Sequence, residues 1–290
     1  MCVNRPTALD LVLARLAFSS ALGCMVTSHG LAQVWAEDPS FGGDGIVMTG
    51  SDTTTANSRG FVLMPGDGMV ITAKWQQDGF SGIALLKYHS DGTLDLSFGT
   101  NGRVLTDFGR SAIEPAGIGL QSDGRFLVVG NDISDPGNPK GFAARFMPDG
   151  NADTTYGANG IVDIHCGAYD FRSEAMEILN DERLLVCGEC PWSGAAVMRL
   201  TSGGAPDTLF GVEGEALLNA ATGAYDVKVQ QNGRIIVAGA SYGNGEDCYI
   251  GRLLPNGSSD TTFGTNGTWT MDLGEPNSMD NTDYLKAVYL

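Results

Sequence analysis

The stretch LDLSFGTNG, at residues 94–102, decides the fold because the chain repeats it. Related stretches are ADTTYGANG at 152–160, PDTLFGVEG at 206–214 and SDTTFGTNG at 259–267, with EDPSFGGDG at 37–45 as a fifth copy of altered spacing. Their aromatic residues, which recur at intervals of 53 to 58 residues, are Phe41, Phe98, Tyr156, Phe210 and Phe263. A period this regular is the signature of a repeat architecture.

The unit from residue 116 to residue 165 reads as four short β-strands. Apolar and β-branched runs at 116–121, 125–130, 141–147 and 160–165 are separated by turns rich in Gly, Asp and Pro. Asp123-Gly124, between the first two runs, is a strong hairpin signal, and the unit shows no helical periodicity. Four antiparallel strands in a unit of this length predict the blades of an all-β propeller.

We place the strand before each Asp-Gly hairpin innermost, because it is short and rich in small residues. Four complete blades then cover residues 60–108, 116–165, 174–219 and 224–272. Residues 45–49 and 283–290 are expected to be the outer and inner strands of a partial fifth blade. The chain is then either a truncated piece of a longer propeller or an incomplete ring, and its exposed edges invite self-association.

The repeated motif suggests its own structural role. We expect its aromatic side chain to lie between neighbouring blades. The motif aspartates, three residues earlier, can accept backbone N–H groups and fix the turn; they are Asp95, Asp153, Asp207 and Asp260. Calcium binding is the alternative, but calcium takes six to eight oxygen ligands and each motif offers one or two carboxylates.

Two segments together carry a family resemblance: LQSDGRFLVVG at 120–130, followed by Asp149-Gly150, Asp153 and Tyr156-Gly157. They resemble the delta-60 repeat, which belongs to a bacterial β-propeller family of unknown function that is common in secreted and surface proteins. The resemblance covers essentially residues 37–290. The third unit departs from the pattern, since 180–182 lacks the turn Gly and 202–204 lacks the turn Asp. The resemblance implies no catalytic residues.

Composition excludes one class of partner. The 290 residues carry a net charge of −17, and phosphate binding requires a basic patch. We therefore expect no nucleic-acid partner. The 41 glycines suit an all-β chain with many tight turns.

The first 36 residues read as a signal peptide, which leaves 37–290 as the repeat domain. The apolar run at 16–26 is too short to span a membrane, and Val34-Trp35-Ala36 suits a signal peptidase. We expect a secreted, periplasmic or cell-surface bacterial protein with no membrane span in the mature chain. Lipid anchoring through Cys24 is the less favoured alternative, because Leu22 fits a lipobox poorly.

Four cysteines remain after processing: Cys166, Cys187, Cys190 and Cys248. An even count in an exported protein predicts two disulfides. The blade scheme places all four on one face, and we expect Cys166 to bond either Cys187 or Cys190. A zinc site of three cysteines and His165, or a redox role, are the alternatives.

Catalytic motifs are scarce in this sequence. The mature chain has only two histidines, His89 and His165, and no nucleophile elbow or zinc-protease motif. We expect a non-enzymatic binding or surface scaffold without a cofactor or metal. The rival function is a carbohydrate-active or other hydrolase on one propeller face, which two inward carboxylates with perturbed pKa values would favour.

The two faces of the predicted propeller differ in their loops. One face carries Asp-Gly turns of nearly constant length, whereas the other carries loops of changing length at 75–81, 131–140, 189–193 and 240–247. Binding residues concentrate on such loops. We expect a protein or carbohydrate ligand to contact this variable face through Trp75, Trp192, Tyr242, Asp132, Asp135 and Asp247.

Overall fold

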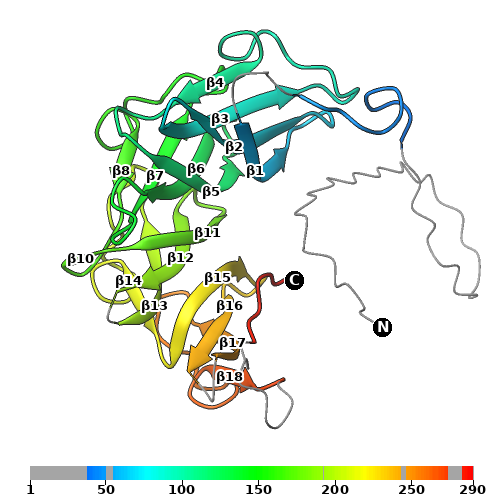
Figure 1. Ribbon diagram of the computed structural model, residues 1–290. Coiled ribbons are helices and arrows are strands. Elements are labelled where there is room, and N and C mark those ends of the chain that lie inside the picture. Colours follow the sequence, from blue (N-terminus) through cyan, green and yellow to red (C-terminus); the bar gives the residue numbers. More distant parts are fainter. Residues whose placement is uncertain (1–37, 50–54, 192, 243–245, 274–282, 290) are drawn as a thin grey trace, which may run out of the picture.

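The computed structural model describes residues 38–49, 55–191, 193–242, 246–273 and 283–289. Within these ranges there is no helix, and four antiparallel four-stranded sheets follow one another along an open arc (Figure 1). In each sheet every strand pairs with the one before it, so each sheet is a meander. This is the arrangement of β-propeller blades, and the predicted fold class is confirmed.

The strands follow the repeats of the sequence. Blade one contains β1 (Thr55–Leu63), β2 (Met69–Gln77), β3 (Phe80–Tyr88) and β4 (Arg103–Thr106). Blade two contains β5 (Ile113–Leu120), β6 (Phe126–Asp132), β7 (Lys140–Phe146) and β8 (Ile161–Asp163). Blade three contains β11 (Arg172–Ile178), β12 (Leu184–Cys190), β13 (Gly194–Leu200) and β14 (Glu215–Leu218). Blade four contains β15 (Ala221–Val229), β16 (Ile235–Tyr242), β17 (Glu246–Leu253) and β18 (Thr268–Met271).

A short ribbon of β9 (His165–Cys166) and β10 (Tyr169–Asp170) joins blade two to blade three. The sequence predicted one strand over 160–165 here. The strand is instead interrupted between β8 and β9 at Ile164, whose N–H still donates to the carbonyl of Gly141 in β7 at 2.8 Å. The four predicted blades otherwise agree with the sheets to within a few residues.

The core lies between neighbouring blades. Three clusters of buried apolar side chains fill the interfaces between blades one and two, two and three, and three and four. Each cluster contains one motif aromatic, Phe98, Tyr156 or Phe210, and none of the three is more than 1% exposed. The predicted role of these aromatics between blades is therefore confirmed. Because both faces of the central blades are covered, strands such as β6 are buried almost throughout.

The motif aspartates fix their turns as predicted. Each accepts the backbone N–H two residues further on, at 3.0 to 3.1 Å, in all four repeats. In three repeats the second carboxylate oxygen accepts an arginine Nε–H at 2.8 Å; the pairs are Arg145–Asp153, Arg199–Asp207 and Arg252–Asp260. Since the protein's own donors occupy both oxygens, the geometry favours the turn over calcium binding.

The expected strands of a fifth blade are not strands in the structure. Residues 45–49 and 283–289 form no ladder, and the ring is not closed. Residues 283–289 lie along blade four, where Leu285 N–H donates to the Gly239 carbonyl at 3.0 Å. Residues 38–49 lie on blade one, where Gly42 N–H donates to the Asp91 carbonyl at 2.9 Å. The prediction already left this partial blade without its middle pair of strands; among the described residues the two segments consequently have no ladder partner and are not β-strands.

Candidate functional site

The innermost strands of all four blades carry a β-bulge. The register of β1 skips Arg59, that of β5 skips Ala116, that of β11 skips Glu174 and that of β15 skips Tyr225. A bulge turns a side chain out of the regular alternation and is frequent beside functional sites. The repeat therefore presents a re-aimed side chain from each blade at an equivalent position, and β15 has a second bulge, at Thr222.

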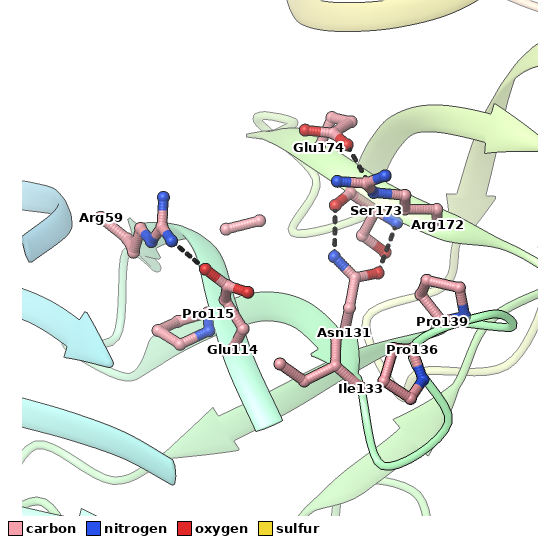
Figure 2. A pocket seen from close by; sticks show the side chains of 11 residues that line it. Arg59, Glu114, Pro115, Asn131, Ile133, Pro136, Pro139, Arg172, Ser173 and Glu174 are labelled. Carbon is pink, nitrogen blue, oxygen red and sulfur yellow. Dashed lines mark hydrogen bonds and ion pairs between the residues drawn. The ribbon is translucent and has the colours of Figure 1, made fainter. Parts of the chain in front are cut away.

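Three of these bulges meet at a pocket of about 510 Å³, which we call the inner pocket (Figure 2). It lies where β1, β5 and β11 approach one another, and the loop between β6 and β7 forms one wall (Figure 2). Its lining residues are Arg59, Glu114, Pro115, Ala116, Asn131, Ile133, Pro136, Pro139, Arg172, Ser173 and Glu174. The pocket thus joins residues of three blades.

Two ion pairs supply most of its charge. Arg59 pairs with Glu114 across blades one and two, and Lys74 Nζ lies 3.6 Å from the same carboxylate. On blade three, Arg172 Nε lies 2.9 Å from Glu174 Oε1, and Arg172 also lies 3.8 Å from Glu189. Hydrogen-bond donors and acceptors therefore lie next to each other both where blades one and two meet and on blade three.

Asn131 and Ser173 hold blades two and three together at the pocket. Asn131 Nδ2 donates to the Ser173 carbonyl at 2.8 Å, and Ser173 N–H donates to Asn131 Oδ1 at 2.8 Å. Both residues are buried. A reciprocal pair of this kind fixes the relative position of β6 and β11 and so the width of the pocket.

Burial changes the protonation chemistry of this region. Desolvation raises the pKa of Glu174; Arg172 opposes the shift and Glu189 adds to it. Burial, with the nearby carboxylates of Glu246, Glu189 and Glu174, also raises the pKa of Tyr225 to about 12. A carboxyl group with a raised pKa can hold and release a proton nearer to neutral pH than an exposed one.

The predicted acidic loop residues of blade two lie beside the pocket without lining it. Asp132 accepts the Ser134 N–H at 3.0 Å and lies 3.6 Å from Arg110. Asp135 accepts the Gly137 N–H at 3.1 Å. The neighbouring Asn131, Ile133, Pro136 and Pro139 line the pocket instead.

The predicted aromatic contacts are spread over the variable face. Trp75 is half-buried in β2, and its indole N–H, also buried, has no hydrogen-bond partner among the described residues. Tyr242 ends β16 and is 81% exposed. Asp247 lies in the facing strand, opposite Ser241. Trp192 falls outside the described residues. The structure does not bring Trp75, Tyr242 or Asp247 to the inner pocket.

The four described cysteines form one disulfide, between Cys166 and Cys190, which is one of the two predicted pairings. The expectation of a second disulfide was wrong, because Cys187 and Cys248 are free and buried. Cys187 Sγ lies 3.6 Å from the Ala224 carbonyl, in the interface between blades three and four. The zinc site of three cysteines and a histidine is not assembled either, since His165 faces Asp170.

Three segments match the family model described as "Domain of unknown function (DUF5122) beta-propeller", at residues 67–98, 121–156 and 230–263. These segments resemble the repeats of a β-propeller family of unknown function. Each matched segment runs from an Asp-Gly hairpin or its equivalent to the motif aromatic. No curated protein matches the chain.

Solved structures show weaker similarity. A protein of unknown function from Dyadobacter fermentans is 13% identical, with 73% of this chain and 69% of that chain covered and a TM-score of 0.47. An inactive variant of virginiamycin B lyase from Staphylococcus aureus, with quinupristin, is 12% identical, with 77% and 72% covered and a TM-score of 0.37. A glucose dehydrogenase is 11% identical, with 70% and 64% covered and a TM-score of 0.42. Similarity of this degree carries no inference about activity.

In the described part of the chain, no helix has the length and apolar character needed to cross a membrane.

Proposed function

We propose that this chain is an exported binding scaffold whose inner pocket holds a polar ligand of carbohydrate type. The observation that carries the proposal is the convergence of bulged residues from three blades on one pocket. A bulge interrupts ladder pairing, so its repetition at equivalent positions favours a role in presenting side chains.

The lining chemistry supports a carbohydrate. A sugar hydroxyl both donates and accepts hydrogen bonds. Each Arg–Glu pair of the inner pocket offers a donor and an acceptor side by side, and Asn131 adds an amide. The charges of the two pairs cancel, which suits a neutral ligand better than a strongly anionic or cationic one.

Export is supported by the Cys166–Cys190 disulfide, since such bonds persist in oxidising compartments. We infer that the repeats are of the delta-60 type, because both halves of that motif recur in the matched segments. Self-association through the open ends of the arc stays a prediction.

A hydrolase is the second candidate, and one observation favours it. Glu114 and Glu174 share the inner pocket, and burial raises the pKa of Glu174. Glycoside hydrolysis uses two carboxyl groups, one of which acts as an acid with a raised pKa. The release of reducing ends from oligosaccharides, with its loss in Glu174→Gln, would favour this function over a scaffold.

Titration calorimetry with neutral oligosaccharides of glucose, xylose and mannose tests the scaffold proposal. We expect binding by the wild-type chain. The double variant R172Q/E174Q removes one ion pair without changing the net charge, and we expect it to weaken binding by about tenfold or more, as the loss of charged hydrogen bonds predicts.

The double variant K140Q/D170N is the matched control. This ion pair of 3.8 Å joins β7 to β10, and neither residue lines the inner pocket, so we expect its removal to leave binding unchanged. Absence of binding to every oligosaccharide, or equal binding by wild type and R172Q/E174Q, would contradict the proposal.

A further inference from the structure

The disulfide has a third metal-binding side chain beside it. Cys166 lies in β9 and Cys190 at the end of β12, and their Cα atoms are 5.8 Å apart. Glu215, the first residue of β14, reaches the same point. The two sulfur atoms and a carboxylate oxygen of Glu215 all lie within 4.8 Å of one another.

Glu215 is held in this position by the backbone. Its Oε2 accepts the Gly167 N–H at 2.8 Å, and its Oε1 lies 3.2 Å from Cys166 Sγ. A hydrogen bond to the far oxygen orients a carboxylate ligand and is typical of metal sites. The turn after β9 therefore supplies both a sulfur atom and the group that positions Glu215.

We propose that, once its disulfide is reduced, this cluster binds one zinc ion through Cys166, Cys190 and Glu215. A dithiol reductant transfers two electrons and two protons to the disulfide, which gives two thiols and the oxidised, cyclic disulfide of the reductant. Zinc then displaces both thiol protons, forming two Zn–S bonds and one Zn–O bond. A small-molecule disulfide can take the two electrons back: its S–S bond is cleaved to two thiolates, the Cys166–Cys190 bond forms again, and the zinc ion is released.

Zinc fits this donor set better than calcium or magnesium. Thiolates select zinc and other thiophilic metals, whereas calcium and magnesium take oxygen ligands. Three protein ligands leave the fourth tetrahedral position for water. Both cysteines are only 2% exposed, so the metal would be largely enclosed.

A zinc titration in competition with a chromophoric chelator tests the proposal. It is carried out on the oxidised chain and on the chain that has been reduced with dithiothreitol and then separated from the dithiothreitol. We expect one equivalent bound by the reduced chain and none by the oxidised chain. Glu215→Gln keeps an acceptor for Gly167 N–H but loses the charge, and we expect at least about tenfold weaker binding. Cobalt absorption should report thiolate coordination in the wild type.

Two controls separate this site from its surroundings. The variant C187A/C248A removes the other buried thiols and should retain the bound zinc. Glu189→Gln removes a carboxylate of β12 that is no part of the cluster, and should also retain it. The proposal is overturned if the folded, reduced chain binds no zinc, if Cys166→Ser or Glu215→Gln binds as tightly as wild type, or if the reduced chain unfolds and zinc does not restore it.

Discussion

Arg199 donates its Nε–H to Asp207 Oδ2 at 2.8 Å, and both side chains are almost fully buried. The same guanidinium lies 4.5 Å over the ring of Phe210 and donates to the Pro255 carbonyl of blade four. Arg145 makes the equivalent contacts with Asp153, Tyr156 and the Ser202 carbonyl. The repeated motif therefore fastens blade two to blade three and blade three to blade four.

Replacing Asp207 with Asn should lower the free energy of unfolding by about 3 kcal/mol, because it leaves two guanidinium groups without their shared charged partner. Those groups belong to Arg183 and Arg199, each 2.8 Å from the carboxylate. Urea unfolding measures the change. Asp181→Asn is the matched control: it removes a more exposed partner of Arg183 and should cost less than about 1 kcal/mol. Equal losses in the two variants would contradict this account.

Stability should fall in acid because motif carboxyl groups have depressed pKa values. The hydroxyl of Ser97, followed by Lys87, lowers the pKa of Asp95 to about 2, and the hydroxyl of Thr262 does the same for Asp260. A carboxyl group whose pKa is lower in the folded than in the unfolded protein stabilises the fold at pH values above its unfolded-state pKa, which is about 4. That contribution is lost as the pH falls from about 4 through about 2.

Urea midpoints measured across this range check the pH dependence. In the variant D95N/D260N the decline should be shallower, since two of the titrating groups are gone. An unchanged slope would show that other carboxyl groups govern acid unfolding.

Gly204→Ala tests the packing of the motif aromatic. Gly204 has a φ of +91°, and a Cβ there would lie 2.9 Å from the ring of Tyr156. We expect a loss of about 2–4 kcal/mol from backbone strain and overpacking together. Gly66→Ala is the control, since it has a φ of +87° with nothing within 4 Å, and should cost only about 1–2 kcal/mol. Thermal unfolding that ranks the two equally would argue against the close packing.

Much of the fold could be predicted because the motif has fixed structural duties. Tyr156 and Phe210 occupy the same packing position between blades, and Asp153 and Asp207 fix the same turn in successive repeats. The spacing of the motif therefore predicts where each blade begins and ends. The choice of Cys166's disulfide partner could also have been narrowed from the sequence. Cys187 and Cys190 are three residues apart, so they point to opposite faces of β12, and only one of them can meet Cys166.

The inner pocket was harder to predict. The differing loop lengths pointed to the variable face and to the loop at 131–140. They did not point to Arg59, Glu114, Arg172 or Glu174. They lie at or near bulges, and a single extra residue reverses which side chains face inward. A charged residue at the start of β5 and of β11, Glu114 and Arg172, was the available signal. Pairing between blades, as in Arg59 with Glu114, depends on tertiary geometry that the spacing does not contain.

Processing of the N-terminus stays a prediction, since residues 1–37 lie outside the described part of the chain. We expect the exported protein to begin near Glu37, directly after Val34-Trp35-Ala36. N-terminal sequencing of the exported fraction checks this. Recovery of Met1 in that fraction would mean that the segment is not a cleaved signal peptide.

Hydrogen exchange with and without the oligosaccharides of the calorimetry panel tests the central claim, that the inner pocket is the binding site. The account predicts slower exchange on ligand addition in β5, the β6–β7 loop and the start of β11, with no change in the motif turns at 94–102 and 206–214. Protection confined to the motif turns, or no protection anywhere in the chain, would contradict it.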